Sequence, residues 1–122
     1  MRLPTRIMLL SQHIRVETAP NLHMPVEGGM DGDHLHRLYG NYSEPTQVIT
    51  LDDALAFERK RETFLHENLH AMCSITQLAT ILEDGLGSGG EEHVVSVLAP
   101  VMLAWLRDNP YAVEFLQEVQ AP

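Results

Sequence analysis

The segment His66-Glu67-Asn68-Leu69-His70 constrains this chain more than any other, because it has the pattern H-E-x-x-H. On an α-helix, residues four positions apart lie one turn apart on the same face, so His66 and His70 can bind one metal ion. Glu67 follows the first histidine, where its carboxylate can reach a water on the metal without being a ligand. Zinc suits two neutral imidazoles and one carboxylate, with a fourth position left for water. The pattern therefore predicts a helix that carries a hydrolytic zinc site.

The composition limits the classes of partner and the number of domains. We expect 122 residues to form a single domain, with residues 1–33 as an N-terminal strand and loop and residues 34–122 as the core. The formal net charge of −9 argues against nucleic acid or an anionic membrane as partner. With seven histidines in the chain, the pattern H-E-x-x-H arises by chance in roughly a few per cent of shuffled sequences, so it needs supporting context. The alternative is a solvent-exposed helix with two surface histidines.

Cysteine content and apolar runs bear on location. Cys73 is the only cysteine, so no intramolecular disulfide can form, which fits a reducing compartment. The apolar run at 7–10 is too short for the core of a signal peptide. The longest apolar run, 94–106, is interrupted and falls short of the roughly 20 residues of a membrane span. These features predict a cytoplasmic protein.

Alternating apolar and polar residues predict a small antiparallel sheet of about three strands. One strand is expected at 14–18, followed by a loop at 19–33. Residues 34–40 and 47–51 are expected to pair as a hairpin, with 41–46 as the turn. A second metal site could be drawn from His23, His34 and His36, but polar strand positions are the favoured interpretation because no carboxylate or cysteine accompanies them.

The H-E-x-x-H segment should lie on a long helix capped by Asp52 or Asp53, whose carboxylates can accept hydrogen bonds from the first turn. Apolar residues at helical spacing predict the face that packs inward: Leu65, Leu69, Met72 and Ile75. Cys73 follows His70 by three residues and could be a ligand. A buried, inert thiol is the favoured interpretation.

A glycine-rich reversal precedes a second helix. Ser88 and Glu91 fit the capping box S-x-x-E, which gives Glu91 a structural role and leaves Glu92 free. The following residues are apolar on nearly all sides, which predicts a buried helix, kinked at Pro100. A carboxylate at the start of such a helix needs a partner, and zinc would serve. A short final helix is expected at 111–119.

With H-E-x-x-H, a glycine-rich reversal and then a glutamate opening a helix, residues 34–116 resemble the gluzincin type of zincin metallopeptidase. They are most similar to the minimal phage and bacterial forms related to ImmA/IrrE-like peptidases. In that group the third ligand opens a helix of pattern E-x-x-A-x-x-F-A. Glu92 fits this frame, with Val95 for Ala and Leu98 for Phe, followed by Ala99. Alignment on Glu91 loses the final alanine.

The resemblance implies an α+β zincin-like fold, in which an antiparallel sheet packs on the active-site helix and a second helix carries a ligand. It implies zinc held by His66, His70 and Glu92, with Glu67 as general base, and a protein or peptide as substrate. Oxyanion stabilisation could come from one of three residues: His93, Arg107 or Tyr111. The alternative function is a catalytically idle zincin-fold binding or assembly module, possibly phage-encoded.

Overall fold

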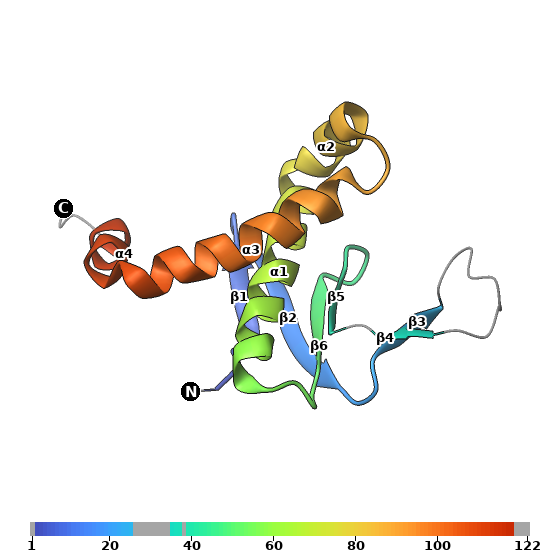
Figure 1. The fold of residues 1–122 in the computed structure, drawn as a ribbon, viewed down its shortest axis with the longest axis horizontal. Helices are drawn as coiled ribbons and strands as arrows, with labels where there is room; N and C mark the ends of the chain where they lie inside the picture. Colours follow the sequence, from blue (N-terminus) through green and yellow to red (C-terminus); the bar gives the residue numbers. More distant parts are fainter. Residues whose placement is uncertain (1, 26–34, 38, 119–122) are drawn as a thin grey trace.

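The computed structural model describes residues 2–25, 35–37 and 39–118, with only the backbone described at 23–25 and 35–37. The chain is α+β, as predicted (Figure 1). Its strands are β1 (Arg6–Leu9), β2 (Gln12–Ala19), β3 (His23–Pro25), β4 (Leu35–Arg37), β5 (Gly40–Ser43) and β6 (Val48–Asp52). Its helices are α1 (Phe57–Thr76), α2 (Leu78–Leu86), α3 (Gly90–Asp108) and α4 (Pro110–Gln117).

The main sheet has four strands in the order β1-β2-β6-β5, and β3 and β4 form a separate two-stranded ribbon. The prediction of about three antiparallel strands is wrong, because β2 and β6 pair in parallel, with Val16 beside Ile49. β1–β2 and β5–β6 are antiparallel. Ile14 and Val16 of β2 lie in the hydrophobic core, so the core also includes residues before position 34.

The predicted hairpin exists with a different first strand. β6 pairs with β5, Gly40–Ser43. Residues 41–43 of this strand were expected to belong to the turn. The turn lies at residues 44–47 and ends at Gln47 in the left-handed region, φ 53°. β4 pairs with β3 instead. Of the histidines considered for a second metal site, His34 lies outside the described residues, and only the backbone is described at His23 and His36.

Helix α1 begins later than expected. β6 continues through Asp52, which is fully buried and accepts a hydrogen bond from the Ala54 amide at 2.9 Å. The N-cap is Ala56, which has no capping side chain. The prediction that Asp52 or Asp53 caps the helix is therefore wrong, because Asp52 ends β6 and Asp53 lies in the segment between β6 and α1.

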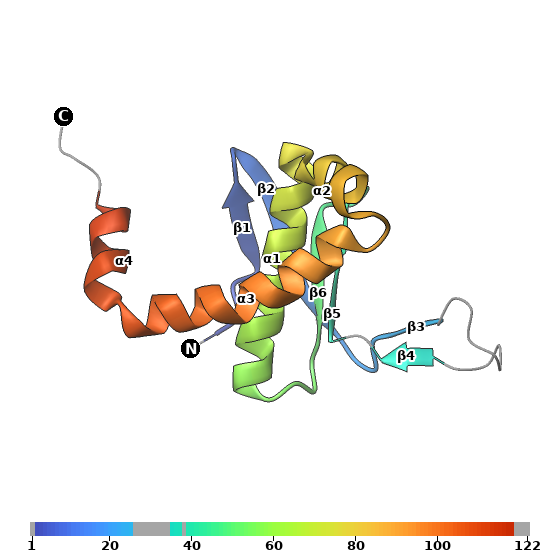
Figure 2. The same ribbon diagram turned by 45° about the horizontal axis from the view of Figure 1, so that its top comes forward.

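Two opposite faces of α1 are covered, so the helix lies between the sheet and α3 (Figures 1 and 2). Ala71 packs on the sheet core, and Leu69 and Cys73 pack on α3. Cys73 is a buried thiol, as expected, and burial raises its pKa. Met72 does not belong to the inward face, because it is exposed between the two covered faces.

Helix α3 crosses α1 and then extends away from the rest of the molecule, ending in α4 (Figure 2). The prediction of a buried helix is wrong: only Gly90, Val95 and Ala99 are buried in α3, all in the half that crosses α1. The helix continues without interruption through Pro100. Among the described residues, no helix has the length and apolarity needed to cross a membrane.

Candidate metal centre

The fold brings together the three residues predicted to bind metal. His66 and His70 lie one turn apart on α1, and Glu92 lies in the first turn of α3. One ligand atom from each lies within 4.8 Å of the others. α3 packs on the Leu69–Cys73 face of α1 through Val95 and Ala99, and this contact places the start of α3 over the histidines.

Two separations between these atoms are close to those expected around a tetrahedral ion. Ligands about 2.0–2.1 Å from such an ion lie about 3.3 Å from one another. Nε2 of His66 lies 3.2 Å from Nε2 of His70 and 3.1 Å from Oε1 of Glu92. Nε2 of His70 lies 2.6 Å from the other carboxylate oxygen of Glu92, Oε2, which is a hydrogen-bond length. Two imidazoles and one carboxylate are a donor set that zinc accepts, so the chemistry of these residues fits the ion.

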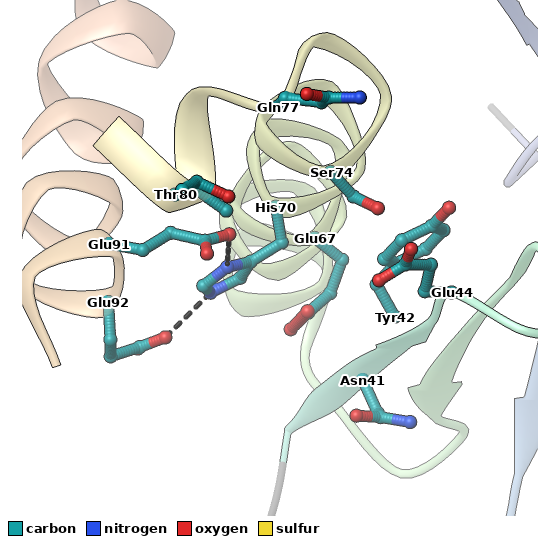
Figure 3. Close-up of a pocket in the computed structure, with 11 residues that line it drawn as sticks. Asn41, Tyr42, Glu44, Glu67, His70, Ser74, Gln77, Thr80, Glu91 and Glu92 are labelled. Atoms are coloured by element: carbon teal, nitrogen blue, oxygen red, sulfur yellow. Dashed lines mark hydrogen bonds and ion pairs between the residues drawn. The ribbon is translucent and has the colours of Figure 1, made fainter. Parts of the chain in front are cut away.

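Glu91 contacts the second ring nitrogen of His70, the one that does not face Glu92. The Nδ1–H of His70 donates to Oε1 of Glu91 at 2.9 Å, while Nε2 faces Glu92 (Figure 3). The capping box from Ser88 to Glu91 is therefore wrong: the N-cap is Gly89, and no side-chain cap is present. The Glu83 carboxylate of α2 accepts hydrogen bonds from the amides of Gly89 and Glu91.

His70 lies within hydrogen-bond distance of two carboxylates, those of Glu91 and Glu92. Burial acts to lower the pKa of His70, but hydrogen bonds to Glu92 and Glu91 raise it to about 9. Hydrogen bonds with His66 and His70 hold the pKa of Glu92 well below its ordinary value. The Glu92 side chain is 59% exposed, so this end of α3 is open to solvent and is not the buried helix start that was expected.

Glu67 lies beside the cluster and points into the adjoining pocket (Figure 3). It is only 6% exposed, and no described residue donates a hydrogen bond to its carboxylate. Burial raises the pKa of Glu67, against the charges of His70 and His66. Gly40 of β5 allows this close packing: a Cβ there would lie 3.1 Å from Cγ of Glu67 and 2.7 Å from Cγ2 of Thr63.

The pocket has a volume of about 570 Å³, within the range of ligand sites. β5 and the turn after it contribute Asn41, Tyr42 and Glu44, residues that sequence analysis assigned only to a turn. Tyr42 is hydrogen-bonded to Ser74 of α1, and burial raises its pKa. These residues could have been identified only from the correct strand pairing, which places β5 against Glu67.

None of the three residues considered for oxyanion stabilisation lines this pocket. Arg107 pairs with Glu58 at 3.2 Å, and Tyr111 is 85% exposed on α4. His93 is exposed on α3. Tyr42 is the aromatic hydroxyl that the fold places at the pocket.

Comparison of the chain with protein-family models, curated proteins and solved structures gives no match. The gluzincin resemblance therefore rests on the sequence motifs described above.

Proposed function

We propose that this chain is a zinc-dependent metallopeptidase with a zincin-like fold. The observation that carries the proposal is the convergence of His66, His70 and Glu92 within 4.8 Å, from two helices, beside a pocket. His66 and His70 were named from their spacing and Glu92 from the family resemblance, and an exposed helix with two unrelated histidines does not require a third possible ligand at the same place.

The chain's residues have distinct roles in this proposal. His66, His70 and Glu92 hold the ion, which when bound would polarise the scissile carbonyl and make water a better acid. Glu67 accepts the proton from the attacking water and delivers it to the leaving nitrogen. Its burial supports this role, because a raised pKa brings a carboxylate closer to neutral pH, where a base can both take and return a proton.

A peptide substrate is supported by the position of β5. This strand is at the edge of the sheet, and Asn41 and Tyr42 on it line the pocket. An extended peptide can add to such an edge through main-chain hydrogen bonds. The scissile bond would then lie between the edge strand and Glu67.

The test is elemental analysis of the purified protein combined with a peptidase assay on a mixed peptide library, with and without chelator. The proposal predicts about one zinc per chain and hydrolysis that chelator abolishes and added zinc restores. Absence of stoichiometric zinc would contradict the metal assignment, whereas stoichiometric zinc without hydrolysis would contradict only the activity.

A second candidate is a binding module that keeps the metal for stability. It is favoured by apolar side chains that are exposed along α3 and α4, including Val101, Phe115 and Leu116. Glu67 favours the enzyme, because a structural metal site needs no carboxylate in a ligand-sized pocket. Unchanged partner binding and no hydrolysis in both the native protein and Glu67→Gln would support the module.

A further inference from the structure

The second half of α3 and the whole of α4 form an arm, residues 97–117, that extends away from the rest of the molecule (Figure 2). Half of the large apolar side chains that are exposed in the described part of the chain belong to this arm. Five of them are more than half exposed: Val97, Val101, Tyr111, Phe115 and Leu116. The arm therefore has the composition of a buried helix and the exposure of a surface helix.

Leu98, Val101 and Trp105 form one apolar stripe on α3. Their spacing of three and then four residues places them on the same side of the helix. Val95 and Ala99, which pack on α1, lie about 100° away around the helix axis. The stripe is 41–60% exposed, so it can pack against another helix while α3 keeps its contact with α1.

The exposed apolar area of the arm has the size of a protein interface. Its large apolar residues together expose roughly 900 Å², since aromatic side chains alone present about 150–250 Å² each. The largest apolar patch on a typical monomer is about 300–600 Å². Each partner in a standard stable interface contributes about 800 Å². The arm thus supplies one partner's share of a stable interface.

The distribution of charge favours a second copy of this chain on the arm. Residues 94–106 contain no charged side chain, although the whole chain has a net charge of −9. Two such chains repel each other through most of their surface. The neutral stripe is where they can meet with least repulsion, and a strongly charged partner would gain no ion pair from it. The same stripe on a second copy is a matching neutral, apolar face.

We propose that two copies of this chain associate through their arms, with the two α3 stripes antiparallel and Val101 at the two-fold axis. In a two-fold interface residue i of one copy contacts residue j of the other and the reverse also holds. Leu98 of each copy then faces Trp105 of the other. Antiparallel packing also places the two acidic bodies at opposite ends of the paired helices. The inference goes beyond the proposed function and depends on neither zinc nor hydrolysis.

Sedimentation velocity over a range of protein concentrations tests the inference, because it gives the dissociation constant of the dimer. We expect the native chain to dimerise with a dissociation constant of about 1–100 µM. Val101→Glu should weaken the dimer at least about tenfold, because it places two like charges at the axis. Ile81→Glu is the matched control, since Ile81 is an exposed apolar residue of α2, outside the arm, and its dimer should be as tight as the native one.

Charge complementation tests whether the partner is a second copy in this register. Val101→Lys alone should weaken the dimer as Val101→Glu does. An equimolar mixture of the two variants should dimerise again, because the introduced charges are then opposite across the axis. High salt should tighten the native dimer, since it screens the repulsion between two acidic chains.

A native chain that sediments as a monomer at every concentration would overturn the inference. So would a Val101→Glu dimer as tight as the native one, an equal loss in Ile81→Glu, or a mixture of the two charged variants that stays monomeric. A native dimer that weakens in high salt would show that ion pairs hold it, which also contradicts the proposed interface. Circular dichroism checks that the variants are folded, which is expected because position 101 is exposed.

Discussion

Glu91 and His70 form a hydrogen bond of 2.9 Å across the interface of α3 and α1, and each side chain is 19% exposed. The bond uses Nδ1 of His70 and thereby leaves Nε2 facing His66 and Glu92. A carboxylate that accepts a hydrogen bond from the second ring N–H of a metal-binding histidine fixes the tautomer and orientation of the ring. In the proposed metal site, the two adjacent glutamates of α3 therefore have different roles: Glu92 would be a ligand, and Glu91 would orient the ligand His70.

Glu91→Ala should weaken zinc binding by about 10- to 100-fold, because His70 loses the group that orients it. Glu91→Gln keeps a hydrogen-bond acceptor and should lose less zinc affinity. Glu92→Gln replaces the proposed charged ligand with a neutral amide and should lose the most zinc affinity. Competition titrations with a chromogenic chelator measure all three. Zinc affinity in Glu91→Ala equal to that of the native protein would show that the hydrogen bond does not serve the metal.

Gly40→Ala should destabilise the fold and disturb Glu67. A Cβ at position 40 would lie 2.7 Å from Thr63 and 3.1 Å from Glu67, so the strand or the helix must move. We expect a loss of about 1–3 kcal/mol in the free energy of unfolding, measured by urea denaturation. Gly85→Ala is the matched control, since nothing lies within 4 Å of a Cβ there and alanine favours helix. In the Gly85→Ala variant, the free energy of unfolding should increase by up to about 1 kcal/mol. Similar effects of both substitutions would argue against close packing at β5.

Zinc affinity should increase with pH up to about 9. Without metal, hydrogen bonds to Glu92 and Glu91 raise the pKa of His70 to about 9 despite burial, so zinc must displace a proton at neutral pH. One displaced proton makes the apparent affinity change about tenfold per pH unit below that pKa. Titrations in metal buffers at pH 7 and 8 measure the slope. A level affinity between them would show that His70 is already deprotonated.

The stability of the metal-free protein should change in the opposite direction. The folded pKa of His70, about 9, lies above its ordinary value of 6.5. The stabilisation from its ion pair is therefore complete below pH 6.5 and is lost as the pH rises through 9. Urea denaturation in the presence of chelator should show a lower free energy of unfolding at pH 9.5 than at pH 6.5. The variant Glu92→Gln should reduce this difference, because His70 loses one of its two carboxylate partners.

Replacing Leu10-Ser11 by Asn-Gly should stabilise the protein by roughly 1 kcal/mol. These two residues connect β1 to β2 and both have positive φ, 46° and 71°, which leucine and serine rarely adopt. Thermal unfolding of the double variant measures the gain. A lower melting temperature would indicate that the exposed Leu10 side chain contributes contacts that outweigh the backbone preference.

The proximity of His66 and His70 could be predicted from the sequence because helical spacing fixes these residues relative to each other. Glu92 was chosen over Glu91 from the family resemblance and from a capping box that the structure does not contain. β1 was missed because its turn, Leu10-Ser11, lacks the glycine and asparagine that mark a two-residue hairpin. The parallel pairing of β2 with β6 depends on the path of the intervening residues, which local patterns do not specify.

The roles of Glu91 and α3 could not be predicted for a similar reason. S-x-x-E is a local pattern, but the contact of Glu91 with His70 depends on how α3 packs on α1. Likewise, apolar residues in α3 indicate burial only if another element covers them, and beyond Ala99 much of the helix remains exposed. Pocket residues Asn41 and Tyr42 were missed because the hairpin was assigned the wrong first strand.

The most direct test of the proposed peptidase is the hydrolysis rate of Glu67→Gln, measured with zinc bound in the same stoichiometry as in the native protein. Glutamine preserves the size of the buried side chain but removes the proton acceptor, and His66, His70 and Glu92 remain. The account predicts that zinc content is unchanged and that hydrolysis decreases at least about 100-fold. A zinc-loaded variant that cleaves peptides at the native rate would contradict the role of Glu67 and the mechanism built on it.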